Sequence, residues 1–268
     1  MAASTIDGQH SHEPSEKRLG TDPTARSLAT RAARRELLYE ALSGGSGLLL
    51  AFFMWGHMFI VGSILLGDRG FDWVAQSLEH YRVAQPTVIG ITSLFLLHAV
   101  LASRKIPAQL RDRRRLRALA RQLGSRAGES AVDASRFAPH TESILWIWQV
   151  RSGMVVLVLG SFHLVLVTFD LFSPSLGART GIEAATSTAR VAGGLWILYA
   201  LLLVCVEFHA GAGLYRLSVK WGAGALLSRG TLHRIEQALV VLFLGFGLVT
   251  LCVLAGWLQP PLAFLLEN

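Results

Sequence analysis

Five apolar stretches restrict the folds available to this chain. They cover about residues 44–66, 84–103, 144–169, 190–213 and 235–258. Each is long enough, or nearly so, for a helix that crosses a bilayer, which takes roughly 17–25 residues. The 268 residues are 52% hydrophobic and only 16% charged, whereas average protein usage is about 25% charged. The sequence therefore predicts an all-α membrane protein with five transmembrane helices in a bundle.

The N-terminal segment, residues 1–30, differs from the rest because it is polar and contains no apolar run. A secretory signal peptide needs such a run, so we interpret this segment as a disordered cytoplasmic extension. Residues 31–268 are expected to form the membrane domain. The two cysteines, Cys205 and Cys252, lie in apolar stretches and indicate neither a disulfide framework nor a CxxCH haem-attachment motif.

Lysine and arginine are distributed unevenly among the connections between the apolar stretches. Segments 31–35, 104–126 and 216–234 are rich in them, whereas segments 67–83 and 170–189 hold few. All three basic segments fall on one side of a five-span topology, and an excess of Lys and Arg marks cytoplasmic loops. We therefore expect a multi-pass protein with a cytoplasmic N terminus and an external C terminus. This topology explains the net charge of +7 better than nucleic-acid binding does.

Four of the five apolar stretches contain a histidine. These residues are His57, His98, His163 and His209. An ionisable side chain inside a membrane is costly and usually functional, and imidazole is a standard protein ligand of haem iron. Four such residues on four helices indicate two iron sites with two ligands each. The alternative is that each histidine makes a hydrogen bond to a neighbouring helix.

The depth of each histidine in the membrane predicts how the four residues pair. His98 and His209 lie near the cytoplasmic ends of their spans, on the order of 6–10 Å from the boundary at about 1.5 Å per helical residue. His57 lies roughly 20 Å deep by the same rise, and His163 lies at a similar or greater depth. We therefore expect an inner pair, His98 with His209, and an outer pair, His57 with His163.

Four local strings carry a resemblance to a known family. They are GHMFIVGSILLGD (56–68), LHAVLASRKIP (97–107), LGSFHL (159–164) and VEFHAGAGLYRLSVKWG (206–222). They resemble the dihaem cytochrome b subunit of succinate:quinone oxidoreductases, the five-helix, single-anchor type of menaquinol:fumarate reductases and related succinate dehydrogenases. The likeness extends over roughly residues 40–235, and it is weak in the fifth span.

The resemblance implies a function and a set of partners. His98 and His209 would be the axial ligands of a proximal haem b, and His57 and His163 those of a distal haem b. The anchor would pass electrons between menaquinone and a cytoplasmic iron–sulfur subunit in a bacterial inner membrane. Dicarboxylate chemistry would belong to a flavoprotein subunit with FAD, so FAD and the iron–sulfur clusters would lie on the partner subunits only.

Two glutamates match family positions that handle protons. Glu79 follows the first span and falls 22 residues after His57, where the family has a glutamate implicated in menaquinol oxidation. An ordinary interfacial glutamate is the alternative. Glu207 lies within the fourth apolar stretch, two residues before His209, where the family has a glutamate linked to transmembrane proton transfer. Intramembrane acids often belong to proton relays, and the alternative is a hydrogen bond to a neighbouring helix.

Four further positions resemble family contacts to haem propionates. Lys220 and Trp146 match contacts near the proximal haem, and Ser43 or Ser46 replaces another polar contact there, although the string LSGGSG departs from the family pattern. Arg190 resembles an arginine near the distal haem, with its spacing to His209 one residue off.

Two other functions compete with this interpretation. Another quinone-linked dehydrogenase or hydrogenase could use a cytochrome b anchor, but the VEFH and LYRLSVKWG strings count against that class. The histidines could also line a metal-ion path in a transporter. Carboxylates at the depth of the histidines would favour a transporter, yet only Glu207 lies within a span.

Overall fold

The computed structural model describes residues 23–104, 106–126, 141–172 and 181–266, and these residues form helices and turns with no strand. The chain divides into two units, residues 1–40 and 41–268. Every candidate site residue lies in the second unit.

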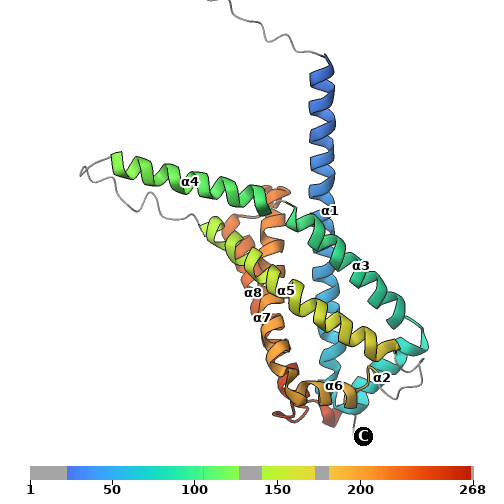
Figure 1. The fold of residues 1–268 in the computed structure, drawn as a ribbon. Helices are drawn as coiled ribbons and strands as arrows, with labels where there is room; N and C mark the ends of the chain where they lie inside the picture. The colour runs from blue at the N-terminus through green and yellow to red at the C-terminus, as the bar shows by residue number, and fades with distance from the viewer. Residues whose placement is uncertain (1–22, 105, 127–140, 173–180, 267–268) are drawn as a thin grey trace, which may run out of the picture. The chain divides into compact units, whose positions relative to one another are not determined.

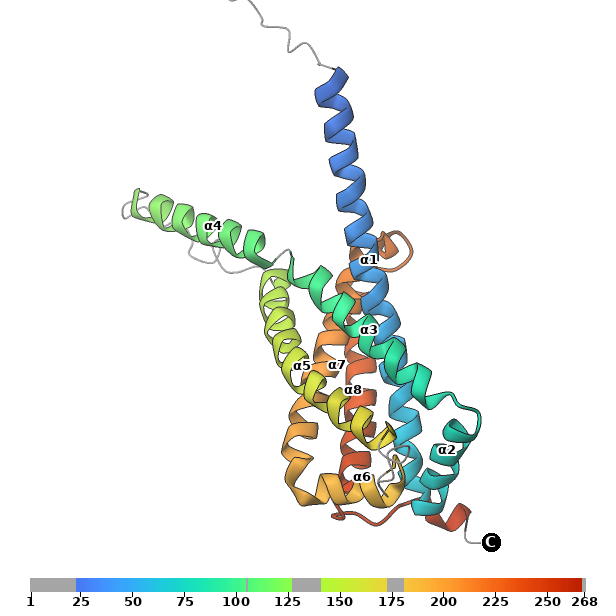
Figure 2. The same ribbon diagram turned by 45° about the vertical axis from the view of Figure 1, so that its right-hand side comes forward.

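Five long helices confirm the predicted all-α membrane fold, because each is long and apolar enough to cross a bilayer. They are α1 (Pro23–Gly62), α3 (Ala84–Ser103), α5 (Thr141–Phe172), α7 (Trp196–Lys220) and α8 (Arg229–Leu254). Figures 1 and 2 show that in the second unit α7 lies beside α8, with α5 crossing in front of them. Many large apolar side chains on these helices stay exposed, as contact with lipid requires.

Three shorter helices connect the spans. They are α2 (Asp68–His80), α4 (Ile106–Arg126) and α6 (Ala184–Arg190). Within the second unit, α4 follows α3 at one end of the bundle, and α2 and α6 lie at the opposite end (Figure 1). We call these the α4 end and the α6 end. Helix α4 contains the arginine-rich run that begins at Arg111.

The predicted polar extension falls partly outside the described residues. Residues 1–22 are not described, and residues 23–30 form the first turns of α1. Their sequence, PTARSLAT, places Pro at the first helical position, where its fixed φ suits a helix and its missing N–H is not needed. Alanine, leucine and arginine, all good helix formers, then continue into ARRELL.

The fourth apolar stretch does not form one uninterrupted helix. Residues Val191–Leu195 form a turn of π-helix between α6 and α7, and Gly194 has a φ of 114° there. An L side chain rarely adopts this backbone conformation, so glycine allows the chain to bend. At the other end of α6, the Asp72 carboxylate of α2 accepts a hydrogen bond from the Ala184 N–H at 2.7 Å. Helix α6 is therefore attached to α2 and bent relative to α7.

The C-terminal segment returns to the α6 end of the bundle. Helix α8 ends at Leu254, earlier than the predicted limit of 258, because Gly256 turns the chain with a φ of 74°. The Leu262 N–H then donates to the Leu65 carbonyl at 2.9 Å, and Arg69 donates to the Leu266 carbonyl at 3.0 Å. A buried apolar cluster that includes Ile64, Phe71, Ala184, Leu251 and Leu254 lies at the same end of the bundle.

Candidate functional site

The structure brings the four membrane histidines together in the pairs that their depths predict. The rings of His98 on α3 and His209 on α7 have centroids 6.4 Å apart, with their planes at 82°. The rings of His57 on α1 and His163 on α5 have centroids 6.1 Å apart, with their planes at 56°. Four different helices therefore supply two separate pairs of imidazoles.

His209 is held against the backbone of α5. Its Nδ1–H donates to the Gln149 carbonyl at 2.9 Å, and a carbonyl can only accept, so Nδ1 carries the proton. Gly153, one turn further along α5, lies under the imidazole. A Cβ at that position would approach His209 Cε1 to 2.6 Å. The glycine therefore allows the ring to come close enough to reach the carbonyl, and Nε2 keeps its lone pair.

His98 is held in the same manner against α1. Its Nδ1 lies 3.2 Å from the Ser43 carbonyl and 3.1 Å from the Ser46 hydroxyl oxygen. That hydroxyl donates its own hydrogen to the Ser43 carbonyl at 3.1 Å. Gly47, four residues after Ser43, lies under the ring, where a Cβ would approach His98 Cε1 to 2.8 Å. A carbonyl and a glycine spaced i, i+4 thus form a seat for each ring of this pair.

The outer histidines have different surroundings. His57 stacks on Phe53, one turn earlier in α1, with centroids 5.7 Å apart and planes at 14°. His163 Nδ1 lies 3.4 Å from the Tyr199 hydroxyl oxygen of α7. A metal-ligating histidine usually makes a hydrogen bond through its other ring nitrogen, and Tyr199 offers that bond to His163.

The spacing of both pairs fits two imidazoles on one metal ion. With a metal–nitrogen bond of about 2.0 Å and a ring nitrogen about 1.1 Å from its centroid, the two centroids lie roughly 6.2 Å apart. The observed separations are 6.1 and 6.4 Å. Among the described residues, no group of three or more His, Cys, Asp or Glu side chains could hold a metal ion. Two-ligand sites fit haem, whose iron takes its remaining ligands from the porphyrin.

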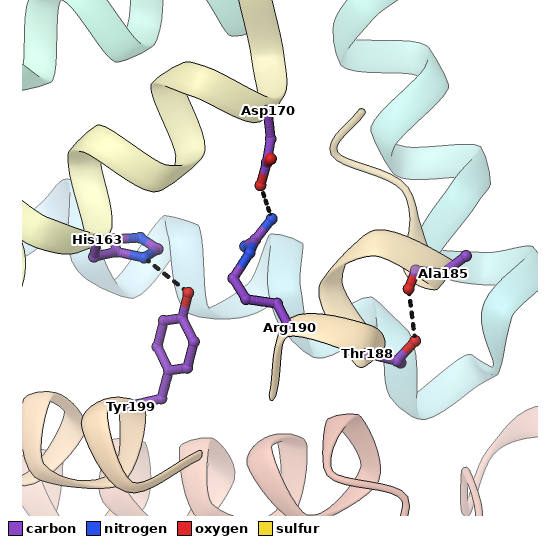
Figure 3. A network of polar contacts seen from close by, with 6 residues as sticks. All are labelled: His163, Asp170, Ala185, Thr188, Arg190 and Tyr199. Atoms are coloured by element: carbon purple, nitrogen blue, oxygen red, sulfur yellow. Dashed lines mark hydrogen bonds and ion pairs between the residues drawn. The ribbon is translucent and has the colours of Figure 1, made fainter. Parts of the chain in front are cut away.

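A polar network lies beside the His57–His163 pair at the α6 end (Figure 3). Arg190, the last residue of α6, forms an ion pair with Asp170 on α5. Figure 3 shows the Arg190 side chain extending toward Asp170, with Tyr199 and His163 to one side. The structure therefore places Arg190 near the pair for which the family resemblance implies it.

The other residues implied near the proximal haem lie toward the α4 end. Ser43 and Ser46 both contact His98, Ser43 through its carbonyl and Ser46 through its hydroxyl. Lys220 is the last residue of α7, and Trp146 is buried near the start of α5. A Cβ on Gly44 would lie 2.8 Å from Leu217 Cδ1, so the end of α7 packs beside the Ser43 segment.

The two glutamates occupy different environments. The side chain of Glu207 is buried, with 2% of the residue exposed, and its Oε1 has no hydrogen-bond partner. Its carboxyl accepts a hydrogen bond from the Trp55 indole N–H of α1. Glu79 is half-buried in the last turn of α2, at the α6 end of the bundle. A buried oxygen without a partner is costly, and the bond to Trp55 joins α7 to α1, as the alternative of a hydrogen bond to a neighbouring helix expects.

Sequence reasoning missed Gln149, Gly47 and Asp170. Gln149 contributes its carbonyl to His209 and accepts a hydrogen bond from Arg216 at 2.5 Å through Oε1. Asp170 pairs with Arg190 across two helices. A recognisable signal existed for Gly47 alone: it lies on the same helix as His57, and a small residue in a membrane span permits the close approach of another helix.

Comparisons with known proteins identify the family of this chain. Residues 129–256 match the family described as succinate dehydrogenase/fumarate reductase transmembrane subunit. The fumarate reductase cytochrome b subunit of Wolinella succinogenes is 31% identical over 217 residues, covering 76% of each chain. The subunits of the same name from two strains of Helicobacter pylori are 29% identical over 233 residues, covering 83% of each chain. The chain therefore belongs to the family of succinate dehydrogenase/fumarate reductase cytochrome b membrane subunits.

Proposed function

We propose that this chain is the electron-transfer anchor of a succinate dehydrogenase or fumarate reductase complex and carries electrons between menaquinone and an iron–sulfur subunit. His98 with His209 and His57 with His163 would each hold one haem b. The observation that supports this most directly is the pair of ring separations, 6.4 and 6.1 Å, together with the Nδ1–H of His209 committed to a backbone carbonyl.

A bis-imidazole haem supplies one-electron chemistry without an open coordination position. The protein supplies the rest. Gln149 and Ser43 orient the rings of His209 and His98, so that each Nε2 lone pair is available for a metal. Lys220, Trp146 and the Ser43 segment would hold the propionates of the proximal haem, and Arg190 those of the distal haem. The apolar spans keep water away from both pairs.

The α6 end would carry the quinone site. A quinol that gives up electrons must also lose protons, and a carboxylate at the membrane edge can accept them. Glu79 is half-buried in α2, which is attached to α6 through Asp72 and Ala184. In a bacterial inner membrane with a cytoplasmic N terminus, this end faces outward. The flavoprotein and iron–sulfur subunits would then dock at the α4 end.

A haem count tests the proposal. The purified complex should show a dithionite-reduced-minus-oxidised spectrum of haem b, with two haems for each copy of this chain by pyridine haemochrome. His57→Ala and His98→Ala should each remove one haem, because each leaves a single imidazole in its pair. His80→Ala is the matched control, since His80 is exposed on α2, and it should keep both. A fully assembled protein without a Soret band would instead favour the metal-ion transporter.

Glu207 is proposed to move protons across the membrane during electron transfer. Glu207→Gln keeps the shape of the side chain but cannot release a proton, so menaquinol-dependent fumarate reduction in proteoliposomes should fall about 100-fold, the low end of the effect of a proton-transfer group. Both haems should remain. Glu236→Gln is the control because Glu236 is also buried, on α8, and it should retain the rate. Equal rates for the two variants would mean that Glu207 has a role in packing and none in proton transfer.

A further inference from the structure

We propose that Asp170 is a positioning residue that holds Arg190 beside the His57–His163 pair and balances its charge there. The proposal rests on the proposed function, since it concerns the haem that this pair would hold. The observation behind it is the ion pair between Asp170 on α5 and Arg190 on α6. Neither composition nor hydropathy links these two residues.

The first support is the position of Asp170 on its helix. It follows His163 by seven residues in α5, which is about two helical turns, so both side chains leave the same face. The rise between them is about 10 Å. Arg190 lies within electrostatic range of His163, and Figure 3 shows its side chain extending toward Asp170, with the His163–Tyr199 contact to one side.

The second support is burial. The side chains of Asp170 and Arg190 are only 13% and 15% exposed. An exposed ion pair contributes little to stability and is easily screened by salt. Removal of one partner from a buried pair, in contrast, leaves the other charge uncompensated. The local field near the histidines therefore depends on both members. A lone Arg190 would place a full positive charge there.

The third support is that the backbone of Arg190 is held in place. Helix α6 is bound at its start, where the Asp72 carboxylate accepts from the Ala184 N–H at 2.7 Å. Its end passes into the π-helical turn at Val191–Leu195. Asp170 then fixes the guanidinium itself, so both the backbone and the side chain of Arg190 are held.

The charges predict opposite effects on the redox potential of one haem. Reduction adds an electron to the site, so a nearby positive charge favours the reduced form and a negative charge opposes it. Asp170→Asn should raise the midpoint potential of the haem at His57–His163. Arg190→Gln should lower it, and the double variant should return close to the wild-type value because the pair is removed as a whole.

A spectroelectrochemical titration of the purified complex tests this, with the haem at His98–His209 as the internal control. The expected result is a shift of one potential only, upward for Asp170→Asn and downward for Arg190→Gln. Asp170→Glu keeps the charge and should keep the potential, which provides a test if Asp170→Asn does not assemble. Unchanged potentials in both Asp170→Asn and Arg190→Gln, a shifted potential in Asp170→Glu, equal shifts at both haems or a downward shift for Asp170→Asn would overturn the proposal. A complex without haem would instead refute the proposed function.

Discussion

Gly153→Ala should cost the protein the haem of the His98–His209 pair while leaving the other in place. The added Cβ would lie 2.6 Å from His209 Cε1 and 2.9 Å from its Nδ1, closer than real Cβ contacts. The imidazole must move away from α5 and so lose its bond to the Gln149 carbonyl. Loss of such a partner typically weakens metal binding about 10–100-fold, and here the ring itself is displaced as well.

The measurement is the pyridine haemochrome count of purified protein, together with the potential of the haem that remains. Gly90→Ala is the control, because a Cβ at Gly90 on α3 meets no atom within 4 Å, and it should keep both haems. Gly47→Ala should act like Gly153→Ala, since its Cβ would lie 2.8 Å from His98 Cε1. Full haem content in Gly153→Ala would show that haem binding at His98–His209 does not depend on the carbonyl and glycine that hold the His209 ring.

Gly62→Ala should destabilise the packing of α1 against α8. A Cβ at Gly62 would overlap with Phe246 Cζ, and an aromatic ring cannot bend away as a flexible side chain does. Phe246 also packs on Phe59 with centroids 5.5 Å apart, which limits its retreat. Forcing extra volume into packed cores costs about 1–3 kcal/mol, so we expect a loss of that size in the free energy of unfolding.

Unfolding in detergent, followed by circular dichroism, measures this loss. Gly56→Ala is the matched control on the same helix, because its Cβ would meet nothing within 4 Å and alanine favours a helix. We expect the free energy of unfolding of Gly56→Ala to equal that of the wild type or to be slightly higher. Equal stability of the two variants would mean that Phe246 repacks without cost.

The spans and the histidine pairs could be predicted because they depend on two quantities that add up from residue to residue, hydropathy and helical rise. Hydropathy summed over a span located α3 at residues 84–103, the limits that the structure has. Depth grows by a constant rise, so it paired His57 with His163 without knowledge of any contact. The break at Gly194 is different, because it follows from one backbone angle.

The surroundings of the histidines could not be predicted for a related reason. Which carbonyl faces His209 depends on the rotation of α5 about its axis, and a small error in that angle exchanges Gln149 for a neighbour. The contact of Asp170 with Arg190 depends on the path between α5 and α6. A sequence predicts the position of a residue along a helix more reliably than the direction in which the residue points around the helix axis.

The two carbonyl seats have a consequence for the speed of the proposed electron transfer. Each seated imidazole belongs to one helix and is tethered to the backbone of another, His209 to α5 and His98 to α1. In the proposed function, iron ligands tethered to helix backbones would have little freedom to tilt or retreat when the charge of the iron changes. Little nuclear rearrangement would then accompany each electron, and the two glycines would keep the reorganisation energy low.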